Sequence, residues 1–430
     1  MVRFAQSAPM TALLWLGVSI WIPIISAAPA SGARRATCTN ETAVVRREWG
    51  LPLPVGWPKR LEGPLVWEGK DLLAQPERWI HILTPDELLE VDAALQHFKH
   101  LEIPHAALTR EHFPLPHLGQ VLRQISHELY QGTGLYLLRG VPVEKYSPED
   151  VVAICLGINA WVGDQRLPQG LNRGLCHIMS ITHLDPQTRG KIFVSAQNAD
   201  AQMYHSDSAA DIVSLMAVAI PGEGGESKVA SSWKVYNHLA KHRPDILRIL
   251  GERKFRWQSK GIPPEGVRLI HWFQEKLLLN LSTRPFIGYA EVPDRDPNFP
   301  ELTWEEREAF AGFNWVADQF SLTIKLQNGD IEWVNNLVLQ HARAGYIDNP
   351  EEPRHLLRVW LRDSELSPAL PDDIKNKFDA IFEEPADFIP LDEWEEDRRR
   401  EQTAIFTASC ESGTAEERLL RFAKEVKTGN

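Results

Sequence analysis

The spacing of apolar and polar residues predicts four helices, three of which begin at a recognisable cap. The sequence TPDE at 84–87 places a hydroxyl, a proline and a glutamate ahead of apolar residues at helical spacing, from Leu88 to Phe98. SPED at 147–150 and TWEE at 303–306 repeat this arrangement, and a fourth helix is predicted over 118–130. We therefore expect helices after residues 84, 147 and 303 as well as this fourth one.

The strand patterns are shorter than the helix patterns and lie mostly later in the chain. Short apolar or alternating runs, bounded by glycine, proline or charge, begin at Gly134, Ile212, Lys276 and Asp330. There is no strict strand–helix–strand alternation and no glycine-rich phosphate loop, which disfavours a nucleotide-binding parallel sheet. The pattern predicts a mostly β fold with flanking helices: a sandwich or jelly-roll core, covered by helices from the N-terminal half and from 303–321.

The chain divides into four predicted parts. Residues 1–37 form a signal-like or anchor segment, and 38–133 form an extended arm and helices that pack on the core. The core domain is expected over 134–390. Residues 391–430 are strongly charged and are typical of a solvated helical tail.

Composition excludes several classes of function. The net charge of -12 would repel nucleic acid and anionic membrane surfaces, so nucleic-acid binding is excluded as a primary function. The 4 cysteines include no closely spaced pair, and neither a disulfide framework nor a zinc site is indicated. The 15 tryptophans are best explained by packing, although they would also suit an aromatic-lined pocket. The sequence predicts no particular oligomeric state.

Two histidines and an aspartate form the strongest chemical pattern. His205 and Asp207 are separated by one residue, so on an extended segment they point the same way, and His341 follows a distant strand pattern. Two imidazoles and one carboxylate leave three adjacent metal positions open, which suits non-haem iron(II) with a bidentate co-substrate and dioxygen. Zinc more often has a closed or histidine-richer ligand set. Taken alone, the His-x-Asp pair would more often be a surface turn.

The arginines downstream of His341 favour a metal site over a surface turn at His205 and Asp207. In the segment RHLLRVWLR at 354–362, strand alternation places Arg354, Arg358 and Arg362 on one face. The planar guanidinium suits a carboxylate, so one of them could hold the distal carboxylate of 2-oxoglutarate while its keto acid chelates iron. A solvent-facing sheet edge is the alternative for each arginine, and it is the favoured interpretation for Arg362.

At these residues the chain resembles the taurine/2,4-D dioxygenase family (TauD/TfdA-like), within the clavaminate-synthase-like group of iron(II)/2-oxoglutarate enzymes. The resemblance extends over roughly 134–365 and includes the HSD segment, the GGES turn at 224–227 and the final arginine-rich strand. The N-terminal half of the chain, up to about residue 130, resembles that of the longer fungal members. The resemblance implies a double-stranded β-helix fold, with His205, Asp207 and His341 as iron ligands.

The resemblance also implies a co-substrate site. Ser227 occupies the position of a hydroxyl residue that hydrogen-bonds 2-oxoglutarate, with serine where many members have threonine. Arg354 and Arg358 match the family's arginine pair, the first binding 2-oxoglutarate and the second lying nearer the substrate. The spacing from His341 leaves the opposite order open. Arg358 and Arg343 would suit an anionic substrate, and the tryptophans an aromatic or terpenoid one.

The predicted function is that of an iron(II)- and 2-oxoglutarate-dependent dioxygenase. It would oxidise a small molecule and release succinate and carbon dioxide, with hydroxylation as the default outcome and desaturation or ring closure open. Secondary metabolism is one setting that this chemistry would suit. Because Asp207 supplies the carboxylate ligand, halogenation is disfavoured. The alternatives are a non-catalytic jelly-roll protein that binds a metal or ligand, and a cupin-type metalloenzyme.

The N-terminus leaves the compartment open. Arg3 precedes an apolar stretch at 11–25 and then small residues, which is the layout of a signal peptide, although the stretch is short for a membrane span. Membrane association is expected only if this segment is an uncleaved anchor, for example in the endoplasmic reticulum, and a mere extension of the gene model is the other interpretation. Asn40 and Asn280 begin glycosylation sequons. The chemistry favours the cytosol, which supplies both reduced iron and 2-oxoglutarate.

Overall fold

The computed structural model describes residues 51–169, 172–179, 195–197, 199–257, 261–287, 300–347, 349, 353–383 and 385–392. All of them belong to one unit of the chain, Val45–Asn430. The signal-like segment, the Asn40 sequon and nearly all of the charged tail lie outside the described residues. Within the described ranges, no helix is both long and apolar enough to cross a membrane.

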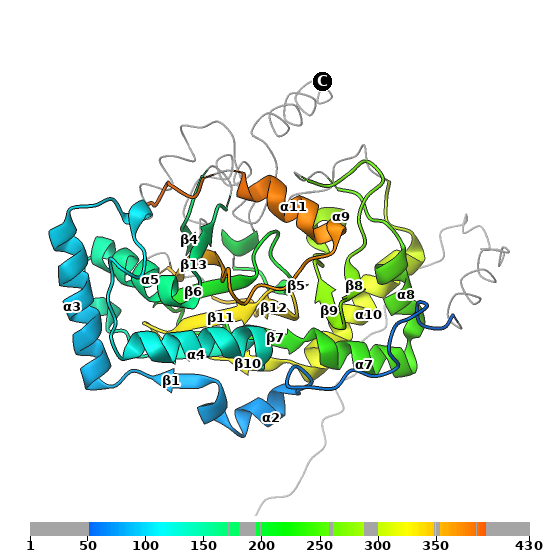
Figure 1. Ribbon diagram of the computed structural model, residues 1–430. Coiled ribbons are helices and arrows are strands. Elements are labelled where there is room, and N and C mark those ends of the chain that lie inside the picture. Colours follow the sequence, from blue (N-terminus) through cyan, green and yellow to red (C-terminus); the bar gives the residue numbers. More distant parts are fainter. Residues whose placement is uncertain are drawn as a thin grey trace, which may run out of the picture. The chain divides into compact units, whose positions relative to one another are not determined.

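Two sheets form the centre of the fold (Figure 1). Among the described residues, the larger sheet has the strand order β1-β2-β11-β6-β13-β3, with β4 also paired to β13, and the smaller has the order β10-β7-β12-β5. The strands of the larger sheet are β1 (Ile80–Ile82), β2 (Leu135–Arg139), β3 (Gln165–Leu167), β4 (Cys176–Met179), β6 (Ile212–Ala219), β11 (Ile331–Asn335) and β13 (His355–Arg362). Those of the smaller sheet are β5 (Gln202–His205), β7 (Ser227–Ser231), β10 (Leu322–Ile324) and β12 (Leu339–Arg343).

The chain alternates between the sheets as it runs forward. Successive strands β5, β6 and β7 lie in the smaller, larger and smaller sheet, and β11, β12 and β13 in the larger, smaller and larger. This alternation is that of a double-stranded β-helix, and the predicted jelly-roll core with flanking helices is confirmed. The site described below lies between the two sheets.

Side-chain alternation separates the core into an interior and two outer layers. Along β13, Leu357, Val359 and Leu361 pack on the outer face of the larger sheet, whereas Leu356 and Trp360 point to the interior. Helices cover both outer faces. On the larger sheet lie α4 (Leu118–Gln131) and α5 (Pro148–Val162), with α3 (Pro85–Leu101) packed against α5. On the smaller lie α7 (Ser232–His242) and α10 (Trp304–Phe320), with α8 (Pro244–Glu252) packed against both.

All four predicted helices are present, and three begin at the expected caps. The hydroxyls of Thr84 and Thr303 each accept a hydrogen bond from the backbone amide of the glutamate three residues on, and the carboxylate of that glutamate accepts one from the threonine amide, so both capping boxes are complete. Ser147 accepts from the Asp150 amide. The fourth helix, α4, covers the range predicted for it.

One strand prediction needs correction, and a second predicted strand is present but lies outside the two core sheets. The run from Asp330 is two strands, β11 and β12, in different sheets, because Asn335 and Asn336 turn the chain between them. The run from Lys276 forms only β9 (Lys276–Leu279), which pairs with β8 (Ile270–Phe273) in a separate hairpin. Covering helices were predicted only from the N-terminal half and from 303–321. The structure adds α7, α8 and α11 (Asp372–Phe382), which were not predicted.

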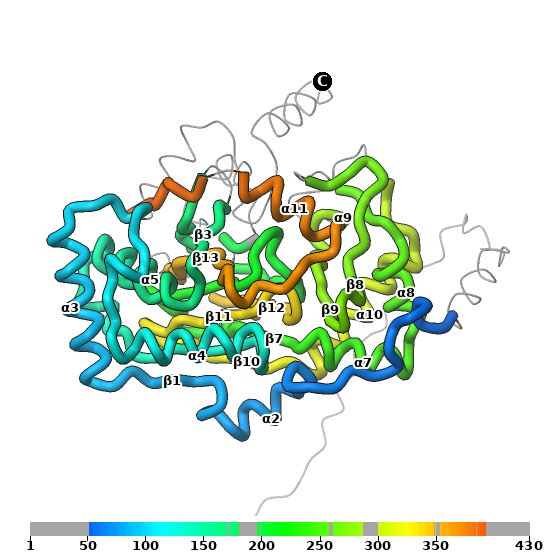
Figure 2. Tube along the Cα trace, in the orientation of Figure 1, coloured from blue at the N-terminus to red at the C-terminus, as the bar shows by residue number. Residues whose placement is uncertain are grey.

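The described part of the N-terminal arm runs across α7 before it reaches the larger sheet (Figure 2). The Asn237 side chain bonds both backbone groups of Leu61, at 2.7 and 2.9 Å, and the Tyr236 hydroxyl donates to the Pro58 carbonyl. The arm then forms a short helix, α2 (Gly69–Leu73), and strand β1. Asn280 is buried and its amide is hydrogen-bonded to Ser208 and Lys377, so this sequon is not accessible in the folded protein.

Candidate metal centre

The two candidate histidines meet because their strands are neighbours. β5 ends at His205, and its antiparallel partner β12 places His341 directly opposite. The two imidazole ring centroids lie 4.3 Å apart. Antiparallel pairing therefore brings together two residues that are distant in the sequence.

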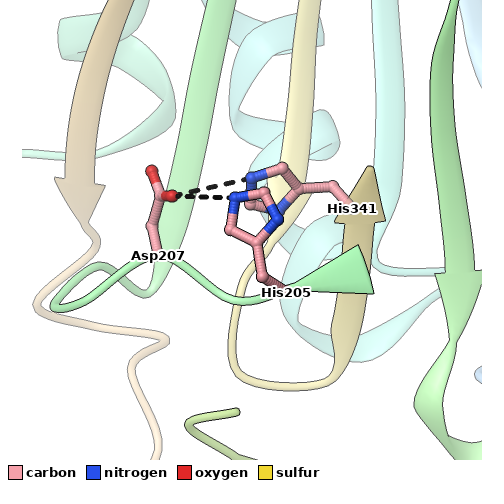
Figure 3. Close-up of side chains that lie close together, drawn as sticks. All are labelled: His205, Asp207 and His341. Carbon is pink, nitrogen blue, oxygen red and sulfur yellow. Dashed lines mark ion pairs between the residues drawn. The ribbon is translucent and has the colours of Figure 1, made fainter. Parts of the chain in front are cut away.

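Asp207 completes the cluster (Figure 3). Its Oδ1 atom lies 3.6 Å from Nε2 of His205 and 3.6 Å from Nε2 of His341. The ligand atoms of the three residues all lie within 4.8 Å of one another. Asp207 Oδ1 is buried and has no hydrogen-bond partner, so a carboxylate oxygen faces two imidazole nitrogens with nothing to satisfy it.

The loop that carries Asp207 is fixed by Asn336. β5 ends before Asp207, so strand alternation alone does not explain its position. Instead, the Asn336 side chain accepts from the Asp207 amide at 2.7 Å and donates to the carbonyls of Asp207 and Ala210 at 3.0 and 2.9 Å. One buried amide thus satisfies three backbone groups of the loop. Sequence reasoning missed Asn336, although an asparagine pair inside an apolar run was a visible signal.

The second carboxylate oxygen of Asp207 is held by the larger sheet. Oδ2 accepts from Arg358 Nη1 at 3.0 Å and from the indole Nε1 of Trp360 at 2.7 Å. Burial raises the pKa of Asp207, but the Arg358 guanidinium and the two imidazoles outweigh it and hold the pKa well below its usual value. Asp207 is therefore ionised and oriented, with Oδ1 directed at the histidines.

Both histidines present Nε2 to the cluster. His205 Nδ1 lies 2.8 Å from the Met203 carbonyl oxygen, which can only accept, so we assign the proton to Nδ1 and a lone pair to Nε2. Burial and the neighbouring His205 lower the pKa of His341, which favours the neutral imidazole that binds metals. The sequence-predicted triad is thus brought together with its donor atoms converging.

Replacing Trp360 with phenylalanine should weaken metal binding. The change removes the indole donor to Asp207 but keeps an aromatic ring, and the loss of such a supporting hydrogen bond typically costs about 10- to 100-fold in metal affinity. Trp333→Phe is the matched control, because Trp333 makes an equally short bond to Asn159 on the outer face of the same sheet. Iron(II) dissociation constants from anaerobic equilibrium dialysis should separate the two variants, and equal losses would contradict the role of Trp360.

A second group of polar residues lines the same cavity. It contains Ser227 at the start of β7, Glu332 on β11 and Arg354 just before β13. Arg354 is buried, and its Nε atom has no hydrogen-bond partner. Burial and the nearby Arg343 lower the pKa of Arg354 to about 9, so its guanidinium remains charged at neutral pH. Sequence reasoning identified Ser227 and Arg354 but missed Glu332.

Arg354, just before β13, and the two arginines within that strand occupy three different environments. Arg354 is the one without a hydrogen bond to any described residue, whereas Arg358 bonds Asp207 and Gln169. Arg362 is not solvent-facing as expected: it is partly buried and pairs with Asp211 at 3.2 Å. Arg343 donates to the backbone carbonyls of Ala196 and Asp200.

The glycine turn before Ser227 requires residues without a side chain. Gly224 and Gly225 have φ values of 80° and 75°, and a Cβ on Gly224 would overlap the Gly345 carbonyl oxygen. Gly225 lies beside Arg354, and its amide donates to the same Gly345 carbonyl at 3.1 Å. The turn thus holds the start of β7 against the segment that follows β12.

Gly224→Ala should therefore destabilise the protein by about 1–3 kcal/mol and disturb the position of Ser227. Gly222→Ala is the matched control, because no atom lies within 4 Å of its added Cβ, and we expect a change within about 0.5 kcal/mol. Urea denaturation of both variants would measure the difference. Equal stability of the two would show that the turn tolerates a side chain.

Comparisons with known proteins agree with this geometry. The model of the taurine catabolism dioxygenase TauD, TfdA family matches residues 99–360. A taurine hydroxylase-like protein, SAT17, of Stachybotrys chartarum is 29% identical over 75% of this chain and 85% of its own. FR-33289 synthase of Streptomyces rubellomurinus is 24% identical over 70% of this chain and 90% of its own. A solved asparagine oxygenase, in complex with Fe(II), 3-hydroxyasparagine and succinate, is 15% identical with a TM-score of 0.51, covering 66% of this chain and 93% of its own.

Proposed function

Because the chain belongs to the taurine catabolism dioxygenase TauD, TfdA family, we propose that it is an iron(II)- and 2-oxoglutarate-dependent dioxygenase whose iron is bound by His205, Asp207 and His341. The observation that carries this assignment is the buried Oδ1 of Asp207, which has no hydrogen-bond partner and lies 3.6 Å from both histidine Nε2 atoms. A metal that bonds each atom at about 2 Å would satisfy all three donors together.

The donor set fits iron(II). Two imidazoles and one carboxylate are the ligand set that suits non-haem iron(II), and all three side chains line the cavity. Iron bound there supplies the activation of dioxygen, which is coupled to the oxidative decarboxylation of 2-oxoglutarate to succinate and carbon dioxide. The protein contributes the binding, the orientation and the exclusion of water.

Each polar residue of the cavity has a distinct proposed role. Arg354 binds the distal carboxylate of 2-oxoglutarate, because it is a buried cation without a hydrogen-bonded partner among the described residues. Ser227 lies at the same end, where its one hydroxyl proton is donated to Glu332, so it supports this site through Glu332. Arg358, already bonded to Asp207, orients the iron ligand instead. In this proposal Arg354 has the role that the family resemblance implied, whereas the role of Arg358 differs from the substrate-side role that it implied.

Hydroxylation of a small molecule is the outcome that we propose. One relative is named a taurine hydroxylase-like protein and another a synthase, and both names suit oxidation of a small molecule, the second in secondary metabolism. The cavity supplies apolar as well as charged lining, with Ile178, Val213, Leu215, Leu326 and Leu356 beside the polar residues. An apolar lining excludes water from the reacting carbon and shields it from side reactions.

Succinate formation tests the proposal. The purified protein, supplied with iron(II), ascorbate, oxygen and 2-oxoglutarate, should convert 2-oxoglutarate to succinate slowly without substrate and faster with the right metabolite. A non-catalytic jelly-roll protein or a cupin-type hydrolase would form no succinate under these conditions. The absence of succinate from an iron-loaded, folded protein would contradict the proposed function.

A further inference from the structure

Glu332 is a carboxyl group in an interior position where the surrounding strand residues are apolar. It lies on β11 between Ile331 and Trp333, which face the outer helices, so it shares the inner face with Val334. Its partners across β2 and β6 are Leu137 and Leu215. A carboxyl group buried at such a position is costly unless it is hydrogen-bonded or serves a ligand.

The hydrogen bonding of Glu332 is only half complete. Its Oε1 accepts from the Ser227 hydroxyl at 2.9 Å, whereas Oε2 is buried and has no partner. Arg354 lines the same cavity with its own Nε unsatisfied, and the two form no ion pair within the described part of the chain. An acid and a cation thus face one cavity without satisfying each other, which is the arrangement expected of a binding site for a third group.

The charges around Glu332 determine its protonation when a dianion binds. Arg354 and Arg343 are the cations nearest the cavity end that Ser227 marks, while Arg358 is paired with Asp207. His205 and His341 line the metal end of the cavity, and Asp330, next in the chain, is paired with Arg139. An ionised Glu332 would therefore repel a carboxylate bound to Arg354, whereas a protonated one could donate a hydrogen bond to it.

We propose that Glu332 is protonated in the 2-oxoglutarate complex and donates its hydroxyl to the distal carboxylate, so that co-substrate binding takes up one proton. The inference rests on the proposed function, because it places 2-oxoglutarate between Arg354 and Ser227. Ser227 then keeps its bond to the other oxygen of Glu332 and orients the acid. Glu332 is therefore a specificity residue, because a carboxylate binds beside it only when the Glu332 side chain is protonated.

Glu332 gains or loses its proton close to neutral pH. Burial raises the pKa of Glu332 to about 7, and the Asp330 charge adds to this, while Ser227 and Arg354 oppose it. Below pH 7 the acid is already protonated in the free protein, so binding takes up few protons. Above pH 7 the free protein has lost that proton, so binding must recover it and the affinity falls by about tenfold per pH unit.

Calorimetry tests this directly, with proton uptake as the readout. 2-Oxoglutarate is titrated into the anaerobic iron(II)-loaded protein at pH 6 and pH 8, in buffers with different heats of ionisation. Iron occupies the two histidines, so they do not contribute protons. We expect uptake close to one proton at pH 8 and close to zero at pH 6. Wild-type binding at pH 8 without uptake would overturn the proposal, whatever the behaviour of any variant.

Glu332→Gln is the matched variant. The amide keeps the size of the side chain, can accept from Ser227 and can donate to the carboxylate, but has no titrating proton. Its 2-oxoglutarate affinity should be constant from pH 6 to pH 8, with no proton uptake. A variant that keeps the wild-type pH slope would contradict the role of Glu332. If neither protein binds 2-oxoglutarate at any pH, the proposed function itself fails, whereas binding without proton uptake overturns this inference alone.

Discussion

Asp207→Ala is expected to abolish iron binding and succinate formation. The change removes the only carboxylate of the candidate cluster, and two histidines alone do not hold iron(II) in a fixed open geometry. Asp207 also forms an ion pair with Arg358, so the change removes a charge partner of this buried guanidinium. Iron stoichiometry and succinate formation, measured on the same folded sample, would check both losses.

His205→Ala separates the loss of the metal from a loss of folding. His205 is partly exposed and has no charged partner other than Asp207 among the described residues, so its removal leaves no new buried charge. It should abolish activity while the thermal unfolding midpoint stays near that of the wild type. Full activity in either the Asp207 or the His205 variant would contradict the ligand assignment.

Arg354→Met is expected to raise the KM for 2-oxoglutarate by about 30-fold or more. Truncating one partner of a buried charged pair costs about 2–5 kcal/mol, which corresponds to roughly 30-fold to several thousand-fold in affinity. Arg354→Lys keeps the charge but not the planar fork, so its KM should lie between those of the wild type and Arg354→Met. Iron affinity should change little, because Arg354 does not contact the triad in any described hydrogen bond.

Arg362→Lys is the control for that series. Arg362 lies on the same strand, but it pairs with Asp211 and does not line the cavity. The same substitution there should leave the KM for 2-oxoglutarate unchanged. A similar increase in KM for the lysine variants at 354 and 362 would show a general effect of altering β13 and would contradict the role of Arg354.

Each of the three candidate ligands has a local signal in the sequence, and the structure brings their side chains together. His205 and Asp207 are adjacent in the chain, and His341 and the arginines follow apolar strand patterns. Alternation correctly placed Arg354 and Arg358 on one face, and the structure adds that this face points between the sheets. The alternation pattern could not show that Arg358 donates a hydrogen bond to Asp207, because that contact joins β13 to the loop after β5 and depends on tertiary packing.

The residues that were missed act across the fold. Glu332 and Trp360 lie in apolar strand runs, where a single polar or aromatic residue gives no pattern of its own, and the asparagine pair that includes Asn336 indicates only that its run is interrupted. Their roles appear only when β11 and β13 are placed opposite the loop after β5 and the start of β7. The run from Asp330 was predicted as one strand because hydrophobicity alone does not reveal that two asparagines turn the chain into the other sheet.

Anaerobic optical titration of the iron(II)-loaded protein with 2-oxoglutarate tests the central claim most directly. A keto acid that chelates iron(II) gives a visible charge-transfer band, and we predict that this band saturates at one 2-oxoglutarate per protein. His205→Ala and Asp207→Ala should show no band, and Arg354→Met should need far more 2-oxoglutarate to reach it. A band of wild-type strength and affinity in the Asp207 variant, or no band in the wild type, would contradict the iron and co-substrate site described above.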